Sequence, residues 1–161
     1  MVEIEKVVDR RKLDYDGILS YSGFYKVIDE FFFEKGYDRQ ERINKEYVTP
    51  SGREVDLELI FWKKLTDYFE SRIKFRIKIF NLENDPNKKM QHGKLMIMTD
   101  GYIRTDYDVV PKWRKNTGLF IIGKLFENLA FKREKNKFKK LVEYDVNHLF
   151  EIIENYLDIK S

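Results

Sequence analysis

Two stretches in the middle of the chain alternate strictly between apolar and charged residues, and this pattern constrains the fold more than any other feature. The apolar positions are Val55, Leu57, Leu59, Phe61, Ile73, Phe75, Ile77 and Ile79, and the charged positions between them are Glu54, Asp56, Glu58, Arg72, Lys74, Arg76 and Lys78. Successive side chains of a β-strand point to opposite faces of its sheet. Each stretch therefore predicts a strand with one face in the core and one charged face.

The charged face of these two strands allows two interpretations. If the strands pair antiparallel, the carboxylates of the first lie opposite the cations of the second, and such cross-strand pairs are each worth roughly 0.2–1 kcal/mol. Four cations on one face of one strand are also the kind of row that follows a phosphate backbone. The neutralising carboxylates favour the first interpretation, a solvated face with paired charges.

The segments around these strands carry the signals of a helix, further strands and turns. Ser20 or Ser22 can cap a helix whose apolar residues recur at helical spacing up to Lys35, and Gly36 can end it. Residues 37–48 predict an exposed or edge strand, and Thr-Pro-Ser-Gly at 49–52 predicts a hairpin turn. A further strand is expected from Lys94 to about Thr105, after a long loop at residues 81–93. In the 37–48 strand, one face would carry Tyr37, Arg39, Glu41, Ile43, Lys45 and Tyr47.

The two ends of the chain complete the expected order of elements. Residues 2–8 alternate weakly and predict a possible first strand, followed by a polar connector at 9–16, whereas residues 118–135 predict a helix and a last helix is expected to start near Asp145. The order β(?)-α-β-β-β-β-α-α predicts a single α+β domain over residues 1–161, a four-stranded antiparallel meander with a possible fifth N-terminal strand and helices packed on one face. It resembles the TATA-binding-protein half and helix-grip folds in topology, which implies no function.

Composition and motif searches remove several functional classes. The chain has no cysteine and only two histidines, which excludes disulfides and thiolate sites, and no metal or other cofactor is predicted. His92 and His148 have no sequence-local partner of known catalytic spacing, and no glycine-flanked serine nucleophile is present, so no catalytic residue is predicted. Nowhere do 18 apolar residues run together and residues 1–11 contain no apolar block, so a cytoplasmic protein without a membrane span is expected.

Positive charge is concentrated in residues 112–140. This segment has ten lysines and arginines but two glutamates, a net charge of +8, so the rest of the chain sums to −5 against a whole-chain charge of +3. A concentrated positive field attracts polyanions such as RNA, and aromatic rings among the cations suit base stacking. The predicted polyanion-binding residues are Lys112, Trp113, Arg114, Lys115, Lys132, Arg133, Lys135, Lys137, Lys139 and Lys140. The alternative is a lysine-rich helix end that keeps the protein soluble.

Three aromatic residues fall outside the apolar stripes of their predicted helices. Phe120 and Phe131 lie together on the side opposite the core-facing stripe of the 118–135 helix, and Phe33 opposes the stripe of the first helix. Exposed aromatic rings are costly unless they are covered. These rings are therefore candidates for a partner surface or a dimer contact, unless other parts of the chain pack over them.

Together these patterns predict a small intracellular binding protein without enzymatic activity. Its predicted partner is RNA or a ribonucleoprotein, contacted through the basic C-terminal region. One alternative is a protein–protein interaction module or homodimer that uses the exposed aromatics. Another is a small-ligand carrier or enzyme with a cavity between the sheet and the helices.

Overall fold

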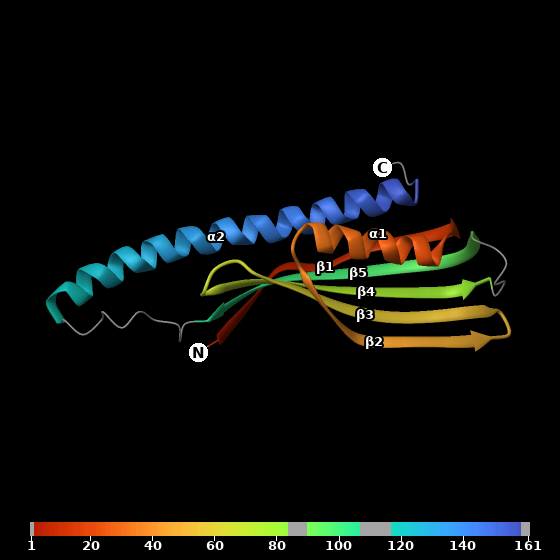
Figure 1. Cartoon of the computed structure of the whole chain (residues 1–161), viewed down its shortest axis with the longest axis horizontal. Coiled ribbons are helices and arrows are strands. Elements are labelled where there is room, and N and C mark those ends of the chain that lie inside the picture. The colour runs from red at the N-terminus through yellow and green to blue at the C-terminus, as the bar shows by residue number, and fades with distance from the viewer. Residues whose placement is uncertain (1, 84–89, 107–116, 159–161) are drawn as a thin grey trace.

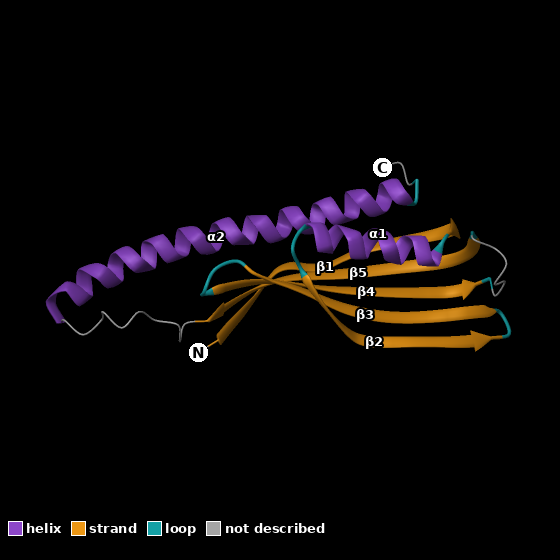
Figure 2. Cartoon of the chain, in the orientation of Figure 1, coloured by secondary structure: helices purple, strands orange, loops and turns teal. Residues whose placement is uncertain are grey.

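The architecture is a five-stranded antiparallel sheet with two helices on one of its faces (Figure 1, Figure 2). The computed structural model describes residues 2–83, 90–106 and 117–158, with side chains in the last range from residue 129 onward. The described residues form the elements β1 (Val2–Leu19), α1 (Tyr21–Glu34), β2 (Asp38–Thr49), β3 (Gly52–Lys64), β4 (Phe69–Leu82), β5 (Gln91–Asp106) and α2 (Thr117–Tyr156). The predicted α+β class, antiparallel sheet and fifth N-terminal strand are thereby confirmed.

The strands lie in the order β1-β5-β4-β3-β2, and every neighbouring pair is antiparallel. Strands β2 to β5 form a meander, and the N-terminal strand β1 pairs with the last strand. Trp62 and Tyr102 lie directly opposite Arg72 on either side of β4, so all three share the sheet face that turns away from the helices. We call this the outer face. Both helices cover the inner face (Figure 1).

The predicted strand pattern in the middle of the chain is confirmed. All eight apolar positions of β3 and β4 are at most 3% exposed and belong to one core cluster. The charged positions share the outer face, with Asp56 opposite Lys78 and Glu58 opposite Arg76. Glu58 departs from the expected solvent exposure, because basic side chains cover it and leave it 4% exposed.

Three boundaries differ from the prediction. The polar residues 9–16 are strand rather than connector, since β1 runs unbroken to Leu19 and pairs along β5 through two register shifts. The two expected C-terminal helices are one helix of 40 residues, because residues 136–144 contain neither proline nor glycine and Val142 continues the buried stripe. The loop expected at 81–93 is shortened by strand residues up to Leu82 and from Gln91.

A register shift also divides the face predicted for β2. It falls between Glu41 and Ile43. Before the shift, Arg39 and Glu41 lie opposite buried β3 residues. After it, Ile43, Lys45 and Tyr47 lie opposite the outer-face carboxylates. One extra residue in a strand reverses the direction of the side chains that follow. On the inner side, Arg39 donates hydrogen bonds to Tyr25 and Asp29 of α1.

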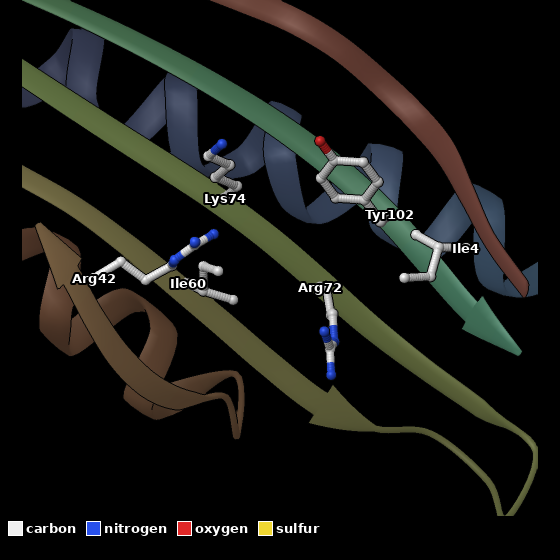
Figure 3. A pocket seen from close by; sticks show the side chains of 6 residues that line it. All are labelled: Ile4, Arg42, Ile60, Arg72, Lys74 and Tyr102. Atoms are coloured by element: carbon white, nitrogen blue, oxygen red, sulfur yellow. The ribbon is translucent and has the colours of Figure 1, made fainter. Parts of the chain in front are cut away.

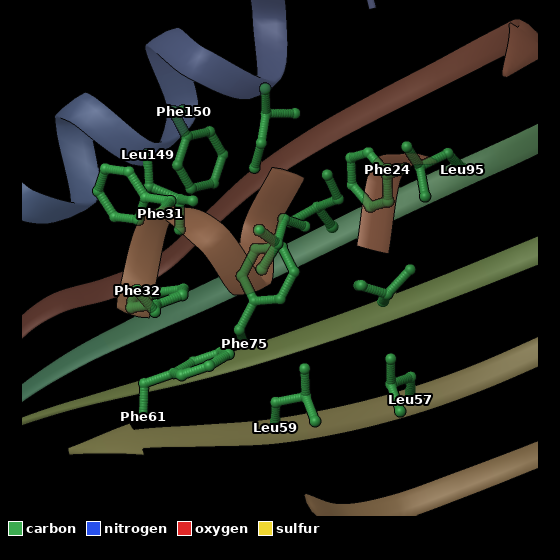
Figure 4. Close-up of a cluster of buried hydrophobic side chains, with 14 of the residues drawn as sticks. Phe24, Phe31, Phe32, Leu57, Leu59, Phe61, Phe75, Leu95, Leu149 and Phe150 are labelled. Atoms are coloured by element: carbon green, nitrogen blue, oxygen red, sulfur yellow. The ribbon is translucent and has the colours of Figure 1, made fainter. Parts of the chain in front are cut away.

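The core lies between the inner sheet face and the two helices (Figure 4). Helix α1 begins as predicted after Ser20, whose hydroxyl accepts a hydrogen bond from the Gly23 N–H at 3.2 Å. Phe32 of α1 stacks on Phe61 of β3 with ring centres 3.6 Å apart, and Phe150 of α2 is also fully buried. Large aromatic side chains thus make up much of the core between the sheet and the helices.

Candidate functional site

The structure describes the side chains of six of the ten predicted polyanion-binding residues, and all six lie in the middle of α2. They are Lys132, Arg133, Lys135, Lys137, Lys139 and Lys140. Lys112, Trp113, Arg114 and Lys115 lie outside the described residues. The helix divides the six into two groups, because successive side chains are rotated by about 100° around its axis.

Lys135 and Lys139 form the group that faces β1. The Lys135 ammonium lies 3.0 Å from a carboxylate oxygen of Glu5 and 3.4 Å from one of Glu3, and Lys139 donates a hydrogen bond to Glu5. The hydrogen bond from Lys139, followed by that from Lys135, lowers the pKa of Glu5. These two lysines hold the helix against the edge strand, and their positive charges are compensated there.

Lys132, Arg133, Lys137 and Lys140 form the second group, and all four are exposed. They fall within an arc of about 140° on the helix, over a length of roughly 12 Å. None of the four has an ion pair within the described part of the chain, so we call this group the basic face of α2. Toward the C-terminus the same side of the helix carries exposed Glu143, which limits the basic face in that direction.

The aromatic residues near these cations pack inward. The ring of Phe131 lies 4.8 Å from the Phe69 ring centre and 6.1 Å from that of Tyr68, and Phe138 lies 5.4 Å from Phe69. These rings form a second hydrophobic cluster between α2 and the ends of β4 and β5. Phe131 and Phe138 are therefore engaged in the fold and not displayed beside the cations for base stacking.

Phe33 is more exposed than Phe131, the other predicted interface aromatic whose side chain the structure describes. Its side chain, on the outer side of α1, is 82% exposed, as its position opposite the core stripe predicts. The side chain of Phe120 lies outside those the structure describes. A partner interface at Phe33, Phe120 and Phe131 stays a prediction.

The outer face of the sheet carries a connected set of ion pairs. Glu58 lies at its centre, with Lys74 at 3.6 Å, Arg42 at 3.7 Å and Arg76 at 4.0 Å. Asp56 accepts two hydrogen bonds from Arg76, at 3.2 and 3.3 Å, and these raise the pKa of the guanidinium. The charges of β3 and β4 are therefore paired across the two strands, as the alternating pattern predicted.

A shallow pocket of about 210 Å³ opens on the same face (Figure 3). It is lined by six side chains contributed by all five strands, namely Ile4, Arg42, Ile60, Arg72, Lys74 and Tyr102. Helix α2 lies on the opposite side of the sheet (Figure 3). Sequence analysis singled out Arg72 and Lys74 as part of a possible binding row, but gave no indication of the other four.

The two histidines are on different elements, and the contacts described for each include no nucleophile. His92 Nε2 lies 3.4 Å from a carboxylate oxygen of exposed Asp16. His148 packs edge-on against Phe31, with ring centres 5.3 Å apart, and its Nδ1 is buried without a hydrogen-bond partner in the described chain. The described residues also contain no cluster of three or more potential metal ligands.

A buried polar cluster that sequence analysis missed ties α2 to the sheet. The Tyr37 hydroxyl donates to Asp145 Oδ2 of α2 at 2.7 Å and lies 2.9 Å from the Ser71 hydroxyl of β4. Lys35 lies 3.6 Å from the other oxygen of Asp145, which is 1% exposed. Burial raises the pKa of Tyr37 far above its ordinary value, with the Asp145 charge acting in the same direction. The hydroxyl therefore stays protonated as a donor.

Comparison of the chain with models of known families, with curated proteins and with solved structures finds no match in any of the three. Among the described residues, neither helix combines enough length and apolarity to cross a membrane. The described surface carries two distinct features, the basic face of α2 and the pocket on the outer face of the sheet.

Proposed function

We propose that this protein binds a polyanion, either RNA or a ribonucleoprotein, through the basic face of α2. The observation that carries the proposal is that Lys132, Arg133, Lys137 and Lys140 are exposed on one side of a helix without a carboxylate partner in the described chain. Cations without a carboxylate partner can meet phosphates without first breaking an ion pair, and the helix sets the spacing of their backbone positions. Each phosphate they neutralise releases condensed counterions, which drives binding.

The inward lysines support this surface indirectly. Lys135 and Lys139 pair with Glu3 and Glu5 of β1 and so fix which side of α2 faces solvent. The function thus divides among neighbouring residues: two lysines position the helix and four cations contact the ligand. The contacts envisaged are to phosphates, because the nearby rings of Phe131 and Phe138 pack against Phe69.

The test is a titration of fluorescently labelled single-stranded RNA, followed by anisotropy at several salt concentrations. In the test variant Lys132, Arg133, Lys137 and Lys140 are replaced by glutamine. The control removes the same formal charge from four exposed lysines on separate elements, namely Lys12, Lys26, Lys45 and Lys64. Both variants keep Lys135 and Lys139, so the helix retains its contacts with β1.

The expected result is a steep fall in wild-type affinity with salt and a flatter dependence for the test variant. Each contact with a single strand contributes roughly 0.7 to the slope of log affinity against log salt, so four lost contacts flatten it by up to about 3. The control variant should keep most of the wild-type slope. The proposal fails if the wild type does not bind RNA at low salt, or if the two variants lose affinity equally.

A further inference from the structure

We propose that the pocket on the outer face of the sheet is a second binding site, which takes a nucleotide: a planar base with a phosphate attached. The pocket lies on the opposite side of the sheet from α2 and shares no residue with the basic face (Figure 3). Much of its floor is the regular β-ladder of β3, β4 and β5, in which Arg72 lies directly opposite Tyr102 and Lys74 directly opposite Ile60. The hydrogen-bonded sheet therefore fixes the spacing of these four residues, whereas Arg42 comes from the register shift of β2.

The cations around the pocket outnumber their carboxylate partners. Glu58 is shared by Arg42, Lys74 and Arg76, and Glu70 is shared by Arg72 and Arg104. With Asp56, which pairs with Arg76, five cations meet three carboxylates. Asp100 of β5 lies directly opposite Lys74, but Lys6 engages it at 3.7 Å and it accepts a hydrogen bond from the Arg10 N–H at 2.7 Å. The excess of two positive charges matches the charge of a phosphate monoester, about −1.5 to −2 near neutral pH.

The lining cations also retain free hydrogen-bonding capacity. Arg42 and Lys74 lie 3.6–3.7 Å from Glu58, beyond the usual 2.7–2.9 Å of a charge-assisted hydrogen bond, and their side chains are 53% and 36% exposed. An arginine has five N–H donors and a lysine three. Most of these donors remain available to phosphate oxygens, to which arginine can bind in a bidentate manner.

The rest of the lining is apolar and includes an aromatic ring. Ile4, 56% exposed, and Ile60 contribute aliphatic surface, and half-buried Tyr102 contributes its ring. Lys6 lies 5.6 Å from the centre of that ring, and its charge is paired with Asp9 and Asp100. A base stacks on an aromatic side chain while its phosphate meets nearby cations, which is the combination used by single-strand-binding proteins. An inorganic anion alone would leave this apolar surface unused.

The size of the pocket limits the ligand to a single nucleotide. A volume of about 210 Å³ lies below the roughly 300–1,000 Å³ typical of drug-sized ligand sites. The nucleotide is either a free molecule or one unit of a single strand. These two sources share the same recognition chemistry and are separated by the experiment.

The first measurement is titration of the ¹⁵N-labelled protein with adenosine 5′-monophosphate, with adenosine and inorganic phosphate as partial ligands. Binding of the nucleotide should shift the amide resonances of Ile60, Arg72 and Tyr102, and each partial ligand should bind at least roughly tenfold more weakly, since each lacks half of the contacts. If adenosine or phosphate binds as well as the nucleotide, the combined recognition proposed here is wrong.

Variants on one strand give a matched comparison. Lys74→Gln should weaken binding roughly tenfold, whereas Lys78→Gln should leave it within about twofold. Lys78 is on the same strand and the same face but does not line the pocket. Tyr102→Leu keeps an apolar side chain while removing the stacking surface, and should weaken binding about fivefold or more. Equal losses for Lys74→Gln and Lys78→Gln would refute the pocket in favour of diffuse attraction.

The source of the nucleotide is tested with a short single-stranded oligoadenylate, applied to the variant whose basic face of α2 carries glutamines. Any remaining binding then does not come from the basic face of α2, so this result is separate from the proposed polyanion function. Oligoadenylate binding that is lost in Lys74→Gln and Tyr102→Leu supports the pocket with a strand as its ligand. Binding of the mononucleotide alone supports a free nucleotide. If neither binds at millimolar concentration, the proposal is overturned.

Discussion

Replacing Tyr37 by phenylalanine tests whether the buried polar cluster holds α2 to the sheet. The substitution keeps the ring, which packs edge-on against Phe32 with centres 5.4 Å apart, and removes only the hydroxyl. The hydroxyl bonds to Asp145 at 2.7 Å and to Ser71 at 2.9 Å, and both partners are at most 1% exposed. Without it, a carboxylate oxygen and a serine hydroxyl stay buried with one partner fewer.

The expected loss follows from the kinds of bonds removed. A hydrogen bond to a charged group contributes roughly 1.5–3 kcal/mol and one between neutral groups roughly 0.5–1.5 kcal/mol, so Tyr37→Phe should lower the free energy of unfolding by about 2–4 kcal/mol. Ser71→Ala removes the weaker bond and should cost about 1 kcal/mol. Lys35, 3.6 Å from Asp145, remains as a partial partner and limits the loss.

Urea unfolding followed by far-UV circular dichroism measures these differences. The matched control is Tyr47→Phe, because the Tyr47 hydroxyl is on a 51% exposed side chain and makes no hydrogen bond within the described chain. That variant should stay within about 0.5 kcal/mol of the wild type. A loss below about 1 kcal/mol for Tyr37→Phe, or an equal loss for Tyr47→Phe, would refute the view that this hydroxyl anchors α2.

Two further predictions concern alkaline pH and the exposed aromatic of α1. Burial raises the pKa of Tyr37 above its ordinary value of 10.0, so above that pH the unfolded chain releases a proton that the folded chain keeps. The contribution of Tyr37 to the free energy of unfolding should therefore fall by about 1.4 kcal/mol per pH unit above pH 10. Tyr37→Phe should abolish this loss. Parallel pH dependences of stability for the wild type and the variant would contradict the prediction. Phe33→Ser should change the free energy of unfolding by less than about 0.5 kcal/mol, because the ring is 82% exposed, and should abolish self-association in sedimentation experiments if the dimer alternative holds. Identical sedimentation of wild type and variant would remove Phe33 from an interface.

The best-predicted parts of the fold are those whose signals are local. The alternation in β3 and β4 placed eight apolar residues in the core, and all eight are buried. Ser20 caps α1 through its hydroxyl, as one of the two serines considered for that position. Such features depend on residues close in sequence, namely the period of a strand and the first turn of a helix.

The errors occur where charged side chains lie on inner faces. Residues 9–16 were interpreted as a connector because they are polar, yet Arg11 is on the inner face of β1 and lies over the ring of Phe150, 4.3 Å from its centre. The helix predicted over residues 118–135 was expected to end among lysines, yet α2 continues through them, and Lys135 and Lys139 pair with Glu3 and Glu5 of β1. In each case the partner that makes the inner position favourable is at least 130 residues away.

The sequence also grouped the cations of α2 without separating their roles. Nine basic residues and Trp113 were predicted as one binding surface, from the charge density and the aromatic rings among the cations. Four of the six described are exposed and two are paired with β1, a division set by how the helix is rotated on the sheet. Charge density thus identified the segment, whereas the packing of Phe131 and Phe138 against Phe69 set which side of it meets solvent.

By itself the sequence determined the α+β class, the two central strands with their buried and charged faces, the first helix and the region of positive charge. Only the tertiary structure decided the pairing of β1 with β5, the single long α2, the buried Tyr37 cluster and the pocket whose lining runs from Ile4 to Tyr102. Periodicity and capping depend on neighbours within a few residues, so they can be predicted from the sequence. Strand register, helix rotation and the matching of distant charges depend on the free energy of the whole packed chain, and no local segment contains that information.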